Sequence, residues 1–327
     1  MLANQKTQNL SQNLRGKMNK TTIIKSQKYY QNFIKKSVEF LQKEAKKRGA
    51  QNLVLGLSGG IDSAVVAALC HKASKQSQLG VFCLSMPSLS SSKDSLTHAK
   101  ELANKFNLPL QILPLKNYQK EFLDSHKNTT QTDFIQQNPS PQNLTSKKPT
   151  LQNPTSQNPT PLEMGNFCAR LRMALLYDYS SRKKALVIGT SNKSELMLGY
   201  GTIFGDLACA INPIGSLYKS EIFVLAKMLK IPKSIISKPP SADLYAGQSD
   251  EDELGFCYAK IDIALEAICK KYGDFRQVKN FTNIKTLDFK NLRDTQGNLL
   301  PKEVVKKAKK RISQNLFKRS LPKIFIP

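Results

Sequence analysis

The sequence predicts an α/β protein with a doubly wound parallel sheet and helices on both faces. Short apolar runs alternate along the chain with longer segments of helical periodicity. Glycine and serine follow the apolar runs, at the strand ends where parallel sheets bind ligands. The chain has 327 residues, 40% of them hydrophobic, which is enough to bury a full core.

Each expected element rests on the local pattern of apolar residues. In the first half these elements are a helix over 29–47, a strand over 53–57, a helix over 63–72, a strand over 81–84, a helix over 94–106 and a strand over 110–115. In the second half they are a helix over 166–180, a strand over 185–189, and helices over 219–229, 250–271 and 301–313. Such alternation is typical of parallel strands joined by crossover helices.

A polar, low-complexity segment over residues 127–161 interrupts this alternation. Asn, Gln, Pro, Ser and Thr dominate it, and Gln-Asn-Pro recurs from residues 137, 152 and 157. Such a stretch cannot bury enough apolar surface to offset the entropy lost on ordering. We therefore expect a disordered insertion within a single domain over 21–327, preceded by a disordered extension over 1–20.

The net charge of +26 suits anionic partners such as nucleotides, RNA or a membrane surface. It is also typical of solvated surface helices, which is the simpler interpretation. The six cysteines show no C-x-x-C spacing, so we expect reduced thiols. No segment approaches the ~18 apolar residues of a membrane span, and the polar N-terminus has no signal-peptide core. We expect a cytoplasmic protein that binds neither nucleic acid nor a membrane.

One motif, Gly56-Leu57-Ser58-Gly59-Gly60-Ile61-Asp62-Ser63, closes the first expected strand and opens a helix. A strand, a tight glycine turn and a helix start together present backbone N–H groups to a phosphate. It is not a Walker A loop, because the Gly-Lys-[Ser/Thr] ending is missing. A purely structural glycine turn is the alternative, but the serine and aspartate in this context favour phosphate binding.

A second motif runs from Val187 through Gly189-Thr190-Ser191-Asn192 to Glu195, and a glycine-rich segment leads on to Asp206. Hydroxyls and backbone amides can meet phosphate oxygens there, while a carboxylate holds Mg²⁺. Glu195 alone would more simply be an acidic residue in a first helical turn. Together with Asp62 of the first motif, it predicts a magnesium–nucleotide site.

The first motif resembles the pyrophosphate-binding loop of the ATP pyrophosphatase family, whose members split ATP into AMP and pyrophosphate. Within that family, longer blocks resemble the NAD synthetases. These blocks are 166–177, 189–206, 212–214, 217–219, 238–244, 247–251 and 254–255. The resemblance covers about residues 25–320 without the insertion. It implies an adenine nucleotide alpha hydrolase-like fold.

The resemblance implies an ATP site in which the first motif holds the pyrophosphate end of the nucleotide. The implied ATP-binding residues are Gly56, Ser58, Gly59, Gly60, Ile61, Asp62, Ser63, Arg172, Thr190, Lys219 and Ser241. Asp62 and Glu195 would bind Mg²⁺. Lys219 would act in catalysis by offsetting the charge that develops as the α-phosphate is attacked.

The resemblance also implies a deamido-NAD site made of Asn166, Arg170, Asp206 and Lys318. Asn166 and Arg170 lie four residues apart in an expected helix, hence on one face. Asp206 would be a second catalytic residue, lying beside the nicotinate and holding ammonium or taking a proton.

Two positions depart from the family pattern. Phe317 stands before Lys318 where relatives carry a histidine, and the segment from Ser85 lacks an adenine-side arginine. Backbone groups around 84–86 would then hold the adenine. The polar segment 241–255 resembles a loop that orders over substrates and excludes water.

The implied reaction forms an amide in two steps. The nicotinate carboxylate of deamido-NAD attacks the α-phosphate of ATP, which releases pyrophosphate and leaves an adenylate. Ammonia then attacks the activated carbonyl, which expels AMP and leaves NAD. Glutamine-using relatives carry a large amidase domain, whereas about fifty residues precede the first motif here. We therefore expect free ammonia as the direct substrate, unless a separate amidotransferase subunit delivers it. The resemblance further implies a homodimer with the dinucleotide site at its interface.

Two other functions compete with this interpretation. A tRNA-modifying ATP pyrophosphatase would suit the basic termini, but needs cysteine pairs or an appended RNA-binding domain, and neither is visible. A nucleotide- or RNA-binding module without turnover would have no need for Asp62, Glu195 and Asp206 together. The acidic set therefore favours an enzyme.

Overall fold

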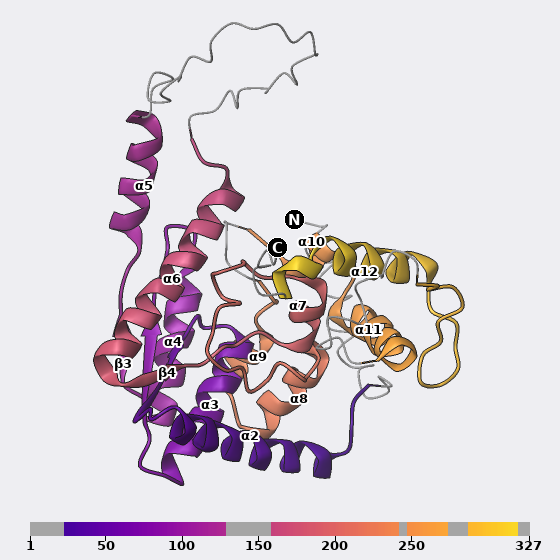
Figure 1. The fold of residues 1–327 in the computed structure, drawn as a ribbon, viewed down its shortest axis with the longest axis horizontal. Helices are drawn as coiled ribbons and strands as arrows, with labels where there is room; N and C mark the ends of the chain where they lie inside the picture. The colour runs from indigo at the N-terminus through magenta and orange to yellow at the C-terminus, as the bar shows by residue number, and fades with distance from the viewer. Residues whose placement is uncertain (1–22, 129–157, 242–246, 274–286, 320–327) are drawn as a thin grey trace, which may run out of the picture.

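The computed structural model describes residues 23–128, 158–241, 247–273 and 287–319. Their centre is a sheet of four parallel strands in the order β3-β2-β1-β4 (Figure 1). The strands are β1 (Asn52–Gly56), β2 (Gly80–Ser85), β3 (Leu110–Ile112) and β4 (Ala185–Val187). Leu53 of β1 lies opposite Val81 on one side and Leu186 on the other. A further parallel bridge joins Ile188 to Ile211 beyond β4.

Alternate side chains of β1 enter different cores, as the two-residue period of a strand requires. Leu53 and Leu55 join one buried cluster, and Val54 joins another. The first cluster is formed with α2 (Gln27–Lys47), α3 (Ile61–Lys75), α4 (Lys93–Phe106) and α8 (Lys219–Met228). The second is formed with α6 (Pro161–Lys183). Helices therefore cover both faces, and the predicted doubly wound fold is confirmed.

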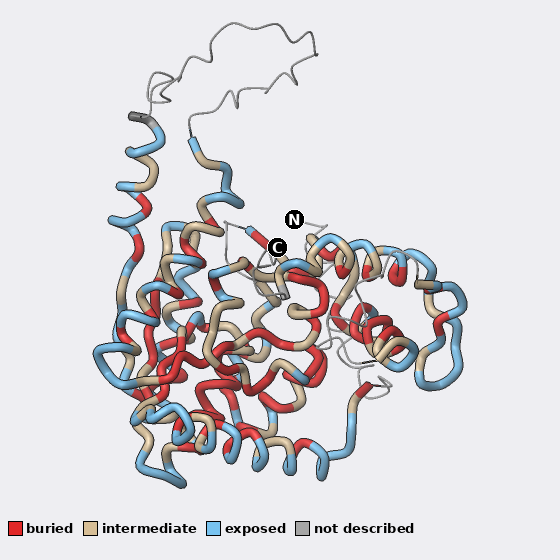
Figure 2. Tube along the Cα trace, in the orientation of Figure 1, coloured by how far each residue is buried: buried red, intermediate tan, exposed pale blue. Residues whose placement is uncertain are grey.

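A third core cluster lies among helices C-terminal to the sheet. It joins α7 (Lys193–Leu198), α10 (Asp250–Leu254), α11 (Tyr258–Tyr272) and α12 (Lys302–Gln314). Two short elements, α9 (Lys233–Ser237) and the 3₁₀ helix η4 (Leu316–Arg319), complete this half of the described chain. Figure 2 shows the buried residues concentrated around the sheet and in these helices.

Helix α6 begins earlier than the expected 166–180 because its N-terminus is strongly capped. The hydroxyl of Thr160 accepts from the backbone N–H of Glu163, whose carboxylate accepts from the N–H of Thr160, and Pro161 opens the helix. The polar helix α5 (Lys116–Asn128) was not predicted, and it projects from the body beside the start of α6 (Figure 1). Helix therefore reaches both ends of the predicted insertion, while residues 129–157 lie outside the described chain.

The single helix expected over 250–271 was wrong. Gly255 adopts a left-handed conformation, φ +70°, and ends α10 before α11 begins. The six cysteines are unpaired, and Cys70, Cys83 and Cys168 are buried. Among the described residues, no helix combines the length and apolar character needed to cross a membrane. The predicted extension over 1–20 lies outside the described residues.

Candidate active site

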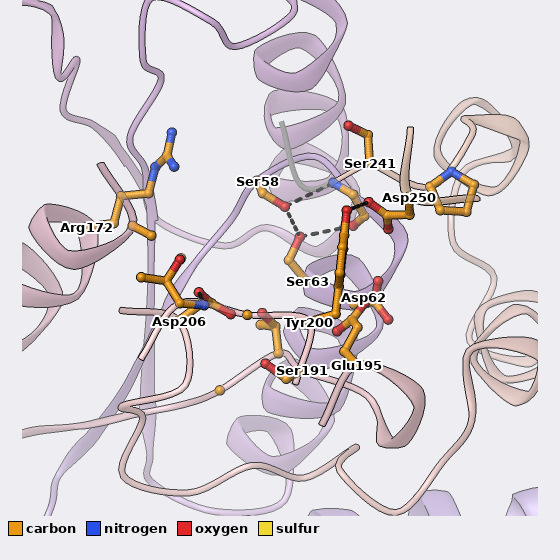
Figure 3. A pocket seen from close by; sticks show the side chains of 18 of the residues that line it. Ser58, Asp62, Ser63, Arg172, Ser191, Glu195, Tyr200, Asp206, Ser241 and Asp250 are labelled. Atoms are coloured by element: carbon orange, nitrogen blue, oxygen red, sulfur yellow. Dashed lines mark hydrogen bonds between the residues drawn. The ribbon is translucent and has the colours of Figure 1, made fainter. Parts of the chain in front are cut away.

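A cavity of about 540 Å³ opens at the carboxyl ends of the strands. Its walls come from the loop after β1, the end of β2, α6, the segment 188–206, residues 238–241 and the C-terminal helices. Figure 3 shows Asp62, Glu195 and Tyr200 gathered on one side of it, with Arg172 and Asp206 on the other. This is the edge where a doubly wound sheet binds ligands.

The loop after β1 needs glycine at position 59. Gly59 has φ +80°, and a Cβ there would lie 2.0 Å from the carbonyl oxygen of Ser95. The next residue, Gly60, caps α3 without any side-chain hydrogen bond to the helix. Because the first N–H groups of a helix lack internal partners, this end of α3 is suited to bind an anion.

Two serines fix the shape of this loop. The Oγ of Ser58 accepts from the backbone N–H of Gly60 at 3.2 Å and lies 3.1 Å from the Oγ of Ser63. Ser63 also donates to the carbonyl of Gly60 at 3.0 Å. Their hydroxyls therefore hold the turn in shape at the cavity wall.

A charged triad, with Lys219 buried and Asp62 and Glu195 partly exposed, links three helices at the floor of the cavity. The Nζ of Lys219, at the start of α8, lies 2.5 Å from Oδ2 of Asp62 in α3 and 3.2 Å from Oε1 of Glu195 in α7. Burial alone would lower the pKa of Lys219, but Asp62, Glu195 and Asp250 together raise it above its ordinary value. Burial raises the pKa of Glu195, and the ammonium of Lys219 opposes that rise. Lys219 is therefore a permanent cation at the floor.

Asn192 aligns both carboxylates of the triad. Its amide nitrogen donates to Oδ1 of Asp62 at 2.9 Å, and its amide oxygen accepts from the backbone N–H of Glu195. Oε2 of Glu195 in turn accepts from the backbone N–H of Asn192 at 3.1 Å. This capping box starts α7 and fixes the position of Glu195.

A second acidic group lies beside the triad. The hydroxyl of Tyr200 is 3.0 Å from Oδ1 of Asp250 and 2.8 Å from Oε2 of Glu253, and Tyr258 donates to Oδ2 of Asp250 at 3.2 Å. Burial raises the pKa of Asp250 above its ordinary value. Gln248 donates to Glu253 at 3.0 Å. The cavity wall here is acidic, and several hydrogen bonds hold its carboxylates in place.

The opposite side of the cavity holds the carboxylate of Asp206, which is exposed to solvent. Asp206 accepts from the backbone N–H of Thr202 at 2.8 Å, and the hydroxyl of Thr202 donates to Asn166 at 2.8 Å. Desolvation by the surrounding protein raises the pKa of Asp206, while the backbone hydrogen bond from Thr202 and, more weakly, the charges of Lys318 and Arg172 oppose the rise. The ammonium of Lys318 donates to the carbonyls of Gly199 and Gly201, each at 2.9 Å.

One cavity thus has two distinct ends. One end has the glycine loop and the ammonium of Lys219, and the other has the carboxylate of Asp206 among amide and hydroxyl groups. A protein-family model described as NAD synthase matches residues 33–143 and 140–322. The chain belongs to the NAD synthase family.

Individual members of the NAD synthase family are similar along nearly their whole length. The NH3-dependent NAD+ synthetase of Campylobacter jejuni is 44% identical over 295 residues, which cover 90% of this chain and 98% of the relative. A solved NH3-dependent NAD synthetase from that species, in complex with nitrate, is 37% identical with a TM-score of 0.63, covering 91% and 99%. A solved NMN synthetase from Francisella tularensis is 29% identical with a TM-score of 0.69, covering 90% and 98%.

Most residues that the NAD synthetase resemblance implied do line the cavity. They are Gly56, Ser58, Gly60, Ile61, Asp62, Ser63, Asn166, Arg172, Thr190, Glu195, Asp206, Lys219, Ser241 and Lys318. Gly59 lies just behind the wall, against Ser95. Arg170 is different: it is exposed on α6 and donates to the carbonyl of Ile203 at 3.3 Å, outside the cavity of this chain.

Arg172, which the resemblance assigns to the nucleotide side, lines the cavity beside the end of β2. Its Nε donates to the carbonyl of Met86 at 3.0 Å. The backbone around 84–86 was expected to hold the adenine, and the same segment lines the cavity. Arg172 therefore braces that backbone from α6.

Sequence reasoning missed several cavity residues. They are Lys238, Tyr200, Asp250, Glu253 and Arg311. Lys238 donates to Ser95 Oγ at 2.7 Å, and Ser95 backs directly onto Gly59. Lys238 lies three residues before Ser241, in one of the blocks that resemble the NAD synthetases. That position could have indicated a place in the site. The acidic run 250–253 lay in both the expected helix over 250–271 and the expected covering loop over 241–255. The structure forms it into α10, with Asp250 and Glu253 in the wall.

The donor set fits a magnesium ion. Asp62 and Glu195 each direct one oxygen to the same ammonium, so they face a common point. Mg²⁺ uses one or two protein carboxylates and takes its remaining ligands from phosphate and water. Within the described ranges no group of three or more His, Cys, Asp or Glu residues has metal-site geometry.

Proposed function

We propose that this protein is an ammonia-dependent NAD synthetase: it amidates deamido-NAD at the expense of ATP, which becomes AMP and pyrophosphate. The observation that carries the proposal is the triad of Lys219, Asp62 and Glu195 at the floor of the cavity, beside the glycine loop. Amide formation from a carboxylate is uphill in water, so ATP is the co-substrate. The similarity to NH3-dependent NAD+ synthetases supports the same reaction.

The glycine loop would bind the pyrophosphate end of ATP through the open N–H groups at the start of α3. The hydroxyls of Thr190 and Ser241 would donate hydrogen bonds to phosphate oxygens. Arg172 would contact the nucleotide part of ATP. Lys238 would add a cation next to the loop, because its ammonium is anchored on Ser95, immediately behind Gly59.

Asp62 and Glu195 would hold Mg²⁺, which when bound screens the phosphate charges and orients pyrophosphate as a leaving group. Lys219 would stay protonated throughout, because neighbouring carboxylates raise its pKa. It would offset the charge that develops on the α-phosphate as the nicotinate carboxylate attacks.

At the other end, Asn166 and Lys318 would bind deamido-NAD, and Asp206 would lie beside its nicotinate. Because desolvation by the surrounding protein raises the pKa of Asp206, this carboxylate is suited to accept a proton as ammonia attacks the adenylate. Arg170 points outward on α6, and its exposure supports a dinucleotide site completed at a homodimer interface. We further propose a cytoplasmic location, in keeping with six unpaired cysteines.

The first experiment offers deamido-NAD, Mg-ATP and either ammonium or glutamine to the purified protein. NAD from ammonium, with equimolar AMP and pyrophosphate, is expected; NAD from glutamine alone would contradict the proposed nitrogen source. The likeness to an NMN synthetase supports a second candidate, amidation of a mononucleotide. A parallel reaction with nicotinate mononucleotide separates the two, and a higher kcat/KM for it would overturn the dinucleotide assignment.

A further inference from the structure

Asp262 is a fully buried carboxylate outside the cavity. It lies in α11 with no exposed surface. One oxygen accepts from the hydroxyl of Ser194 at 2.5 Å. The other accepts from the backbone N–H of Ser220 at 2.9 Å and from its hydroxyl at 2.7 Å. This one side chain therefore joins three helices, α7, α8 and α11.

Both of its serine partners are sequence neighbours of the triad. Ser194 precedes Glu195, and Ser220 follows Lys219. The hydroxyl of Ser194 also accepts from the backbone N–H of Lys219 at 2.9 Å. A continuous path of hydrogen bonds thus runs from the start of α7 through Asp262 to the start of α8.

Burying the carboxylate of Asp262 in a core costs free energy. Burial raises its pKa to about 6, and the bonds from Ser194 and Ser220 only partly oppose that rise. None of the ion pairs found among the described residues includes it. An apolar side chain would fill this site between helices at lower cost. Its three hydrogen bonds, all to the turns that carry Glu195 and Lys219, give the carboxylate a specific use.

We propose that Asp262 is a positioning residue that sets the separation of Lys219 from Glu195 and Asp62. This inference rests on the proposed function, because it assigns Asp262 a role in the adenylation step. It acts through Ser194 and Ser220 and does not touch substrate. Losing it lets the first turns of α7 and α8 shift, which moves the ammonium of Lys219 away from the α-phosphate.

The test measures single-turnover pyrophosphate release, followed over hours so that slow variants remain measurable. A misplacement of about 1 Å can cost about 10²-fold in rate. Accordingly, Asp262→Ala should lower the rate about 100-fold and the more conservative Asp262→Asn about tenfold. The KM for deamido-NAD should stay within about twofold, because the Asn166 end is untouched.

Leu265→Ala is the matched control. Leu265 is fully buried one turn further along α11, in the same core, and makes none of these hydrogen bonds. It should lose comparable stability yet keep a near-normal rate in the folded state. Equal rate losses in Leu265→Ala and Asp262→Asn, at matched stability, would overturn the proposal.

A double-mutant cycle with Lys219→Met gives the decisive comparison. If Asp262 acts through Lys219, Asp262→Asn should cause less than about twofold further loss once Lys219 is gone. The same fold loss in both backgrounds would refute the positioning role. If the wild-type protein itself forms no NAD, the proposed function fails instead, so the two failures are distinguishable.

Discussion

The ammonium of Lys219 lies 2.5 Å from the carboxylate of Asp62, although 157 positions separate the two residues in the chain. One begins α8 and the other lies in the first turn of α3, beside the glycine loop. The contact therefore joins two distant segments of the chain at the point where ATP is proposed to bind. It also places a fixed cation in contact with a carboxylate proposed to hold a metal ion, so the binding of that ion must redistribute these contacts.

Removing the ammonium of Lys219 should slow adenylation more than it weakens substrate binding. Lys219→Met is expected to lower kcat about 10²–10³-fold, because charge on the α-phosphate is then left uncompensated. Pyrophosphate release measures the effect, with circular dichroism to verify folding. A loss below about tenfold would show that Lys219 does not stabilise the transition state.

Glu195→Ala should abolish pyrophosphate release and leave the protein folded. The substitution also removes the capping-box carboxylate of α7, at a cost of about 1 kcal/mol of unfolding free energy. Glu163→Ala is the control, since it removes the same kind of capping carboxylate from α6. Glu163 does not line the cavity, so that variant should keep its activity. Pyrophosphate release retained by Glu195→Ala would rule out the metal assignment.

Gly59→Ala should damage the phosphate loop, because its Cβ would meet the backbone of Ser95. Gly49 has a similar φ, +64°, but open space around its missing Cβ. Gly49→Ala should therefore cost only the left-handed penalty of roughly 1–2 kcal/mol. Gly59→Ala should cost more and raise the KM for ATP about tenfold or further. Equal thermal melting and equal KM in the two variants would argue against the close approach.

Lys238→Ala tests whether the ammonium of Lys238, which donates a hydrogen bond to Ser95, also binds phosphate. Hydrogen bonds to charged groups contribute about 1.5–3 kcal/mol, so the KM for ATP should rise at least about tenfold. The KM for deamido-NAD should hardly change. Lys233→Ala, an exposed lysine of the neighbouring α9, is the matched control and should behave as wild type. An unchanged KM for ATP in Lys238→Ala would remove this residue from the site.

The Asn/Gln/Pro-rich segment should be dispensable for turnover. Replacing residues 129–157 with a short Gly/Ser linker keeps the Thr160 cap of α6 and all of α5. NAD formation should stay within about threefold, because no cavity residue is altered. A hundredfold loss would give this segment a role in the reaction.

The fold and the glycine loop could be predicted because their signals are local. The apolar runs and the glycine turn identify β1, α3 and the cavity edge from about thirty consecutive residues. Side chains brought in from distant segments could not be predicted in this way. Tyr200 and Asp250, fifty positions apart, meet only once the C-terminal helices pack together. Asp262 is a similar case, because its serines lie on two other helices.

Local apolar periodicity predicted the wrong helix bounds where a helix cap interrupted it. The apolar pattern over 250–271 is compatible with one helix, but Gly255 ends the first part with a left-handed residue. Arg170 and Arg172 shared one predicted helix, and the structure directs one outward and the other toward Met86. The spacing put Arg170 on one helical face with Asn166, whereas of these two only Asn166 lines the cavity, because the partners of each side chain depend on the tertiary fold.

The hydrogen bonds of Asn192 would influence which ion the proposed metal site selects. Asp62 and Glu195 each give one oxygen to Asn192, so each has one oxygen left toward Lys219 and the cavity. Carboxylates divided in this way favour one-oxygen coordination. Ca²⁺ commonly takes both oxygens of a carboxylate within a large, flexible shell, whereas Mg²⁺ accepts single oxygens and keeps its waters. Asn192, which caps α7, would thereby also disfavour Ca²⁺.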